Sequence, residues 1–238
     1  MVALVALAAP LQAGDLVVDP APVPDEDSWE FSITPYGWLP WIDITTGGGT
    51  DIEIDGEDVL DSLQMTAQFE LGLRKGKWGL TTDVFYAELE FDLGDVILDD
   101  LDLQMWLVTP RLSYRAREGN WGYFDLQAGA RYTNVDVAVN TEIRRGPGSE
   151  SASGDVWDFT VGFRGRYHID EHWYLGYYGE IGAGESDLVT QAFMDVGYRW
   201  EHADLFLGVR YVYFDFPSNF AMQDLSMFGP VIGARFTF

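Results

Sequence analysis

The feature that most constrains how this chain can fold is a strict alternation of apolar and polar residues, which begins at Trp29 and recurs in segments of about ten residues. From Leu63 to Leu73 every odd position is apolar and every even position is polar or glycine. The segment from Trp157 to Tyr167 alternates in the same way, with Gly165 as its only gap. Because successive side chains of a strand point to opposite faces, this period predicts strands with one apolar and one polar face.

Applied to the whole chain, the pattern predicts ten strands, over 29–44, 63–73, 78–89, 101–115, 121–137, 156–167, 173–183, 191–200, 205–214 and 222–238. The connections alternate between short ones (74–77, 116–120, 168–172, 201–204) and long ones (45–62, 90–100, 138–155, 184–190, 215–221). Outer-membrane barrels have short periplasmic turns and longer outside loops. We therefore predict an all-β fold: a single transmembrane antiparallel up-and-down β-barrel of ten strands, with eight or twelve strands as the alternatives.

The predicted strands over 78–89 and 101–115 are the least regular. In 101–115 the apolar positions are Leu101, Leu103 and Met105, after which the apolar phase moves to Trp106 and Val108. An extra residue in one strand shifts the phase of every residue that follows. We therefore predict a β-bulge near Met105.

The domain boundaries follow from the ends of this pattern. No run of about 20 apolar residues occurs, so the sequence predicts no transmembrane helix. The first residues, MVALVALAAPLQAGD, resemble the apolar core and small-residue end of a secretory signal, and we assign 1–14 to a signal-peptide remnant. Prolines at 20, 22 and 24 cannot pair in a sheet, so we assign 15–28 to an acidic, proline-rich linker and 29–238 to the barrel.

The chain is strongly acidic, with a formal net charge of -25 from 39 acidic and 14 basic residues, and it has no cysteine. Such a charge repels polyanions and excludes nucleic acid as a partner. Many of the acids fall in the first two long connections: Asp51, Glu53, Asp55, Glu57, Asp58, Asp61, Asp92, Asp95, Asp99 and Asp100. They predict a solvated outer surface, with loosely bound divalent cations as the alternative. We expect no cofactor and no dedicated metal site.

The remaining charges predict a filled lumen. An arginine on the lipid face costs about 2–4 kcal/mol at mid-bilayer, and the arginines within the strands take the polar phase. Charges buried together must pair, because isolated ones are too costly to desolvate. We therefore predict a largely plugged lumen with an inward-facing charge network of Glu70, Asp83, Arg111, Asp125, Arg131, Asp158, Arg164, Arg166, Glu180, Asp195, Arg199, Arg210 and Arg235. Arg74 is assigned to a short turn.

Aromatic residues gather at the ends of the predicted strands, where interfacial girdles form. The predicted membrane-interface aromatics are Trp29, Trp78, Trp121, Trp173, Trp200 and Phe238. Trp38 takes the inward phase and is left out of this set. The alternating C-terminal end resembles the signature that the outer-membrane assembly machinery reads. We therefore expect that machinery, together with outer-membrane lipids, as partners.

Two segments carry a family resemblance: SITPYGWLP (Ser32 to Pro40) and ELGLRKGKWGLTTDVFY (Glu70 to Tyr86). They are similar to a family of uncharacterised outer-membrane β-barrel proteins of Gram-negative bacteria. The resemblance implies the barrel fold and location in the bacterial outer membrane. It brings no catalytic or ligand-binding motif.

The three histidines decide what we expect of function. Enzymatic outer-membrane barrels resemble one another in relying on an active histidine, and a protease or lipid A enzyme needs it near the outer rim. His168, His172 and His202 fall in predicted periplasmic turns. We therefore expect no enzyme and no catalytic residue, but a structural envelope protein or a narrow pore for small solutes. The alternatives are a lipid- or peptide-modifying enzyme and a soluble β-barrel that binds an apolar ligand.

Overall fold

The structure is a computed structural model, and it describes residues 28–46, 49, 51–92, 100–143, 146–217, 220 and 222–238. The predicted signal remnant and all but the last residue of the predicted linker lie outside these ranges. Within them, no helix is long and apolar enough to cross a membrane. The elements described are β1 (Trp29–Trp38), β2 (Trp41–Thr46), β3 (Asp51–Ile54), α1 (Gly56–Asp61), β4 (Leu63–Lys75), β5 (Trp78–Asp92), β6 (Asp100–Gly119), β7 (Gly122–Ile143), β8 (Gly146–His168), β9 (Trp173–Gly184), β10 (Leu188–Arg199), β11 (Ala203–Asp215) and β12 (Met222–Thr237).

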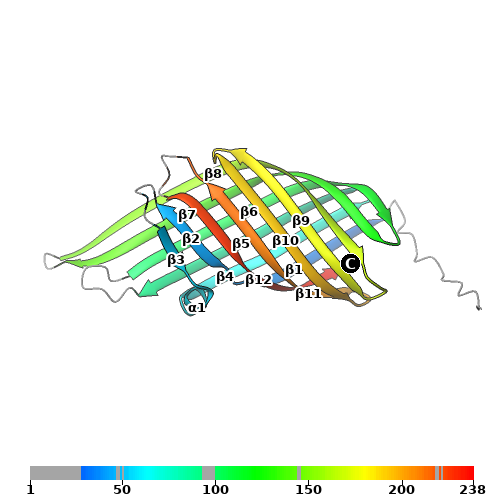
Figure 1. The fold of residues 1–238 in the computed structure, drawn as a ribbon, viewed down its shortest axis with the longest axis horizontal. Coiled ribbons are helices and arrows are strands. Elements are labelled where there is room, and N and C mark those ends of the chain that lie inside the picture. The colour runs from blue at the N-terminus through cyan, green and yellow to red at the C-terminus, as the bar shows by residue number, and fades with distance from the viewer. Residues whose placement is uncertain are drawn as a thin grey trace, which may run out of the picture.

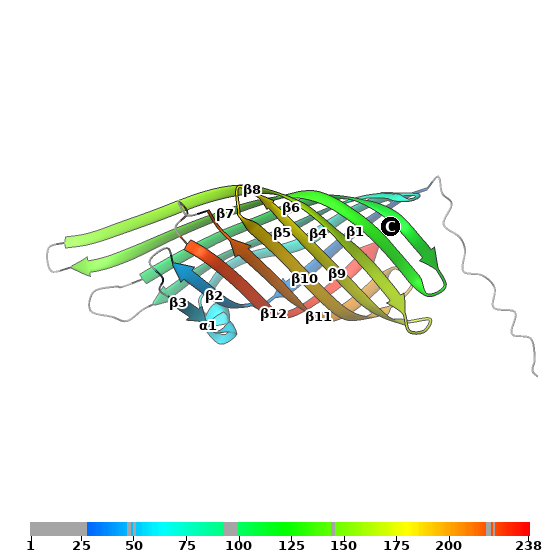
Figure 2. The same ribbon diagram turned by 45° about the horizontal axis from the view of Figure 1, so that its top comes forward.

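The strands form a closed antiparallel barrel. β1 and β4 to β12 pair in sequence order, and β1 closes the ring by pairing with both β4 and β12. The strands are steeply tilted, as Figures 1 and 2 show, and the C-terminus lies at the end of the barrel that carries the short turns. β2 and β3 are additional: β2 continues along β12, and β3 pairs with β2. The predicted ten-stranded transmembrane barrel is confirmed.

The predicted first strand over 29–44 is wrong in one respect, because it breaks at Leu39 and Pro40 into β1 and β2. The register between β1 and β4 ends at Pro35 opposite Phe69. Proline donates no backbone hydrogen bond and interrupts a ladder. Beyond this point β2 pairs with β12 and, on its other side, with β3 instead of β4. In the described part of the chain the outer end of β4 pairs only with β5.

The predicted β-bulge near Met105 is also wrong. β5 and β6 pair in unbroken register from Trp78 opposite Tyr114 to the outer ends of both strands. Met105 is 5% exposed and points inward, whereas Trp106 is 37% exposed and points outward. The apolar residues of β6 therefore change from the inward face to the outward face without a bulge. The inward positions are apolar as far as Leu107, where the barrel interior is apolar, and the outward positions become apolar from Trp106 onward, after the polar Asp102 and Gln104.

Two predicted outer loops are largely regular structure. β7 and β8 pair without interruption from Gly122 opposite Tyr167 to Ile143 opposite Gly146. The predicted loop over 138–155 is therefore mostly a two-stranded ribbon, which extends beyond the other strands (Figure 1). The predicted loop over 45–62 contains β3 and α1, and β3 agrees with the alternation of residues 51–55.

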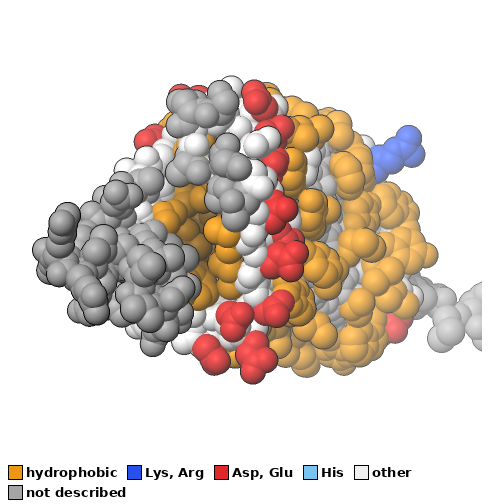
Figure 3. Space-filling model, turned by 60° about the vertical axis from the view of Figure 1, so that its left-hand side comes forward, with side chains coloured by type: hydrophobic (Ala, Val, Ile, Leu, Met, Phe, Trp, Pro, Cys, Tyr) orange, Lys and Arg blue, Asp and Glu red, His pale blue; other side chains and the backbone are white. Residues whose placement is uncertain are grey.

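The barrel exterior is a belt of exposed apolar side chains. At the short-turn end, the predicted interface aromatics Trp29, Trp78, Trp121, Trp173, Trp200 and Phe238 are each 41–77% exposed. At the outer end a second level consists of Trp41, Trp106 and Trp157. On β8 the belt runs from Trp157 to Tyr167, a length that matches the roughly 9–11 residues of a tilted membrane-spanning strand. Acidic side chains border the belt at its outer edge (Figure 3).

Candidate functional site in the barrel lumen

The interior of the barrel changes character along its axis. At the short-turn end it holds a polar chamber, which we call the inner chamber. In the middle, charged side chains from opposite walls meet in a central charged layer. In the outer half, the inward positions are apolar and surround a small cavity, which we call the outer apolar pocket.

Glu180 of β9 is the hub of the central charged layer. Arg111 of β6 binds it as a fork, with distances of 3.0 Å from Nε to Oε2 and 3.1 Å from Nη2 to Oε1. Arg131 of β7 donates from Nη2 to the same carboxylate and, at 2.6 Å, to Oε1 of Gln191. Both arginines are at most 2% exposed. Such bidentate pairs fix geometry as well as charge, so Glu180 ties β9 to two strands on other parts of the wall.

A second cluster joins Asp83 of β5, Arg210 of β11 and Tyr36 of β1. Nη2 of Arg210 lies 2.9 Å from Oδ2 of Asp83. The Tyr36 hydroxyl donates to the other carboxylate oxygen at 2.7 Å and accepts from Nη1 of Arg210 at 2.8 Å. Arg210 also donates to Oε1 of Gln191 at 3.2 Å, which links this cluster to the one around Glu180.

The layer is completed by Glu70 and Arg164, which pair through Nη1 and Oε1 at 2.8 Å, and by Arg235, which donates to the Thr34 hydroxyl at 3.3 Å. Each of the ten barrel strands thus contributes one side chain. The central charged layer consists of Tyr36, Glu70, Asp83, Arg111, Arg131, Arg164, Glu180, Gln191, Arg210 and Arg235. Eight of these side chains, all except Arg131 and Glu180, line a cavity of about 70 Å³.

The inner chamber is wider, at about 500 Å³. Asp125 lies on its wall and accepts from both Arg74 and Arg115 at 2.5 Å. Arg166 pairs with Asp204 at 2.8 Å. The assignment of Arg74 to a turn is therefore wrong: it lies in β4 and points inward.

The structure does not bring every predicted network residue into an ion pair. Asp158 accepts a hydrogen bond at 2.8 Å from the backbone N–H of Ser186, so it caps the connection between β9 and β10. Asp195 lines a small cavity with three arginines, without a direct ion pair among the described residues. Arg199 lies near His168, with 3.0 Å between Nη2 and Nε2, and 3.9 Å from Asp204.

Sequence reasoning missed Tyr36 and Gln191, which bridge the charged pairs. Both take the inward phase of their strands and carry hydrogen-bonding groups, which is the signal that marks them in the sequence. The predicted network contains charged residues only.

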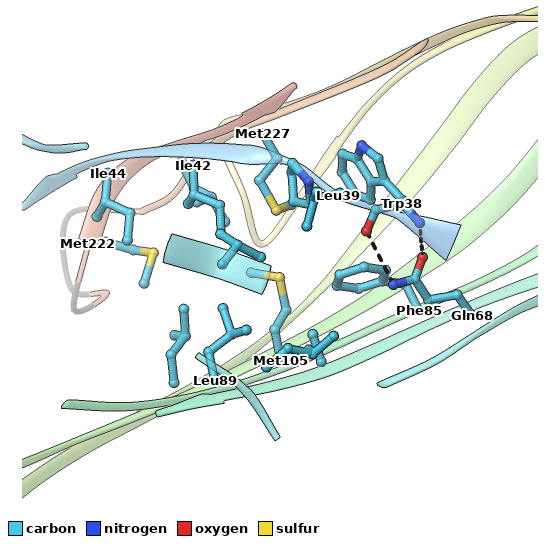
Figure 4. A pocket seen from close by; sticks show the side chains of 16 residues that line it. Trp38, Leu39, Ile42, Ile44, Gln68, Phe85, Leu89, Met105, Met222 and Met227 are labelled. Carbon is cyan, nitrogen blue, oxygen red and sulfur yellow. Dashed lines mark hydrogen bonds between the residues drawn. The ribbon is translucent and has the colours of Figure 1, made fainter. Parts of the chain in front are cut away.

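The outer apolar pocket is lined almost wholly by hydrophobic side chains, among them three methionines (Figure 4). The inward phase therefore forms an apolar lining in the outer half of the barrel, in contrast to the charged lining of the inner half. The polar exception is Gln68, whose amide accepts from the backbone N–H of Trp38 at 2.6 Å and donates to its carbonyl at 3.4 Å. The Arg210 guanidinium lies 4.7 Å from the Trp38 ring, so this ring separates the pocket from the central charged layer.

The histidines lie at the short-turn end. His168 ends β8, His172 stacks on Tyr198 with 5.3 Å between ring centroids, and His202 is exposed in the turn before β11. Asp170 accepts from the backbone N–H groups of Trp173 at 2.7 Å and His172 at 2.8 Å, and these bonds lower the pKa of its carboxyl. Nowhere in the described part of the chain do three or more potential metal ligands converge. Asp95 and Asp99, two of the loop acids, lie outside the described residues.

Comparison with known proteins gives structural neighbours only. No protein-family model and no curated protein matches the chain. The outer membrane protease OmpT from Escherichia coli aligns over 89% of this chain and 97% of its own, with a TM-score of 0.50 and 10% identity. Ail, the attachment invasion locus protein of Yersinia pestis, aligns over 89% and 99% with a TM-score of 0.44 and 12% identity. OprG from Pseudomonas aeruginosa aligns over 89% and 96% with a TM-score of 0.35 and 15% identity.

The chain is an outer-membrane β-barrel. The likeness to OmpT concerns the fold, and the apolar belt between two aromatic levels supplies the surface that such a barrel presents to lipid. The predicted location in the bacterial outer membrane is confirmed. The same belt is incompatible with the alternative of a soluble barrel, because it would leave a continuous apolar surface in water.

Proposed function

We propose that the protein is a non-enzymatic envelope barrel whose lumen is closed to ions and small solutes by the central charged layer. One observation carries the proposal: inward side chains from all ten barrel strands make up the central charged layer, and the cavity that eight of them line measures only about 70 Å³. Barrels of about eight strands are filled by side chains, whereas those of sixteen or more enclose water. Ten strands lie near the filled end of this range.

The energetics of the layer favour a lasting seal over a gate. Its five arginines face three carboxylates, which are Glu70, Asp83 and Glu180. Removing one member of a buried ion pair leaves the other charge buried without a partner and costs about 3–5 kcal/mol. A path for ions through this layer would have to separate several such pairs at once. The excess of two positive charges adds a barrier to cations.

The absence of enzymatic activity belongs to the same proposal. It is supported by the position of the three histidines, which lie around the turns at the end opposite the outer apolar pocket. Their observed contacts suit a role in the turns: His172 stacks on an aromatic ring, and His168 lies beside Arg199.

We also propose that the assembly machinery of the outer membrane recognises β12. This strand pairs with β11, β1 and β2, so barrel closure depends on it. The terminal Phe238 is 77% exposed and therefore available for recognition.

The test is single-channel recording of the refolded protein in a planar bilayer. We expect no sustained open state from the wild type. The double variant Arg111→Ala/Glu180→Ala removes one charge of each sign from the layer and should conduct. The matched control, Arg166→Ala/Asp204→Ala, removes an equivalent pair from the inner chamber and should remain closed. A heat-modifiable band in electrophoresis verifies that each variant is folded. A large, stable wild-type conductance would overturn the proposal.

A further inference from the structure

We propose that the outer apolar pocket binds an uncharged alkyl chain, which reaches it from the outer leaflet through a gap in the barrel wall between β4 and the β1–β2 junction. The inference joins two features that share residues. Leu39, Pro40, Leu63 and Gln68 border the gap, and the same four residues line the pocket.

The gap arises from the sheet register. β1 and β4 separate after Pro35 opposite Phe69, yet β4 continues as far as Leu63. On this side, residues 63–68 have no paired strand within the described ranges. The Gln68 amide bonds to both backbone groups of Trp38 and takes the place of a ladder at the inner end of the gap (Figure 4).

Helix α1 forms the outer border of the gap. Val59 is 5% exposed and lines the pocket, whereas the neighbouring Leu60 is 58% exposed. The helix packs near Trp41, and the backbone N–H of Glu90 donates to the Ser62 carbonyl at 2.9 Å just after the helix. The wall beyond the gap therefore consists of α1 and of β3, which pairs with β2, and neither element pairs with β4 among the described residues.

The gap lies at the level of the outer membrane interface. Gln68 is opposite Phe85, one residue from Tyr86, whose ring packs 4.4 Å from that of Trp106 in the outer aromatic level. Met65 and Trp41 flank the gap on the barrel exterior and are 56% and 44% exposed. An alkyl chain that moves from the lipid into the pocket would thus remain among apolar side chains.

The residues that line the outer apolar pocket determine which class of ligand it can bind. No charged side chain lines the pocket. Its cavity measures about 40 Å³, which suits a short chain segment, and the flexible Met105, Met222 and Met227 can move to admit more. Outside the gap lie acids, including Glu88 opposite Met65 and Glu57 of α1. These acids repel a carboxylate or phosphate head group, so the favoured ligand carries an uncharged one.

The experiment uses the full-length protein in lipid nanodiscs and a decan-1-ol that carries an aliphatic diazirine. After irradiation, mass spectrometry locates the labelled residues. We expect labels on pocket residues such as Met105 and Met222, with at least fivefold competition by decan-1-ol and far less by decanoate at pH 8. Labels confined to the lipid-facing belt would overturn the proposal, and equal competition by decanoate would overturn the selectivity for uncharged heads.

A matched pair of variants tests the location. Ala87→Trp fills the pocket, and Ala128→Trp makes the same change on the exposed outer face of β7. We expect Ala87→Trp to reduce pocket labelling at least fivefold and Ala128→Trp to leave it unchanged. If Ala87→Trp does not fold to a heat-modifiable form, Ala87→Leu replaces it with a graded loss expected. Unchanged labelling in a folded pocket variant would contradict the proposal.

Discussion

At the residue scale, Glu180 shows how one side chain can organise a lumen. Its two carboxylate oxygens accept from Arg111 of β6 and Arg131 of β7, and all three side chains are buried. A buried charge that loses its partner is costly. Glu180 therefore matters for stability because its removal would leave the charges of Arg111 and Arg131 buried without a partner.

We therefore predict that Glu180→Gln is strongly destabilising. The amide would keep the shape of the side chain but not its charge, so Arg111 and Arg131 would face each other without compensation. The expected loss in the free energy of unfolding is about 3 kcal/mol. A urea titration of the protein in lipid vesicles, followed by the heat-modifiable band, measures it. The control Glu88→Gln, on the exposed outer face of β5, should change the free energy by less than about 0.5 kcal/mol. Equal effects of the two substitutions would contradict this reading.

The phase of a residue in its strand predicts which way its side chain points, but not what it contacts. Asp158 and Glu180 both take the inward phase, yet only Glu180 meets arginines. Asp158 lies directly opposite Arg131 in the β7–β8 register, but the Arg131 guanidinium donates to Glu180 and Gln191, and Asp158 accepts from the backbone N–H of Ser186. Alternation gives the face of a side chain, and it does not determine which of several neighbours on that face the side chain binds.

At the element scale, the sequence predicts the positions of the short turns more accurately than the positions at which strands break. Each predicted short turn leaves only two to four residues outside the strands, and glycine enables the tightest bends. Gly122 at the start of β7 has φ of 128°, and a Cβ there would lie 1.8 Å from the Arg166 carbonyl oxygen. Only glycine fits both constraints.

Gly122→Ala should accordingly destabilise the barrel by about 1–3 kcal/mol, the usual cost of a residue forced into such a backbone conformation. Gly37→Ala is the matched control, because a Cβ at Gly37 meets only one side-chain atom, at 3.9 Å. Refolding yield and urea unfolding, both read from the heat-modifiable band, report the effect. A Gly122→Ala barrel as stable as the Gly37→Ala barrel would show that the turn relaxes.

The errors at this scale share one cause. The segment 101–115 suggests a bulge because its apolar residues change from the inward to the outward phase near Met105. The segment 29–44 suggests one strand because its pattern continues across Pro40. Both errors fall in the outer half of the barrel, where the interior is apolar and β1 no longer pairs with β4. A period-two argument assumes one polar face, and this assumption fails where the lumen itself is hydrophobic.

At the scale of the whole molecule, the charge and the apolar surface are separated along the barrel axis. The arginines are concentrated in the central charged layer and the inner chamber, while exposed acids border the outer edge of the belt (Figure 3). The large negative charge visible in the sequence therefore belongs mainly to the outside surface. It does not describe the lumen, where the central charged layer carries an excess of arginine.

This arrangement predicts a depth-dependent cost for a charge on the exterior. Val161 is 49% exposed near the middle of the belt on β8, and Asp155 points outward from the same strand beyond Trp157. In lipid vesicles Val161→Arg should lower the free energy of unfolding by about 2–4 kcal/mol, and Asp155→Arg by at most about 1 kcal/mol. Urea titration of both variants in vesicles measures the difference. In vesicles of a thinner bilayer the Val161→Arg cost should fall, because water and head groups then approach the arginine more closely. Equal costs at the two positions would mean that the bilayer does not cover the belt between Trp157 and Tyr167.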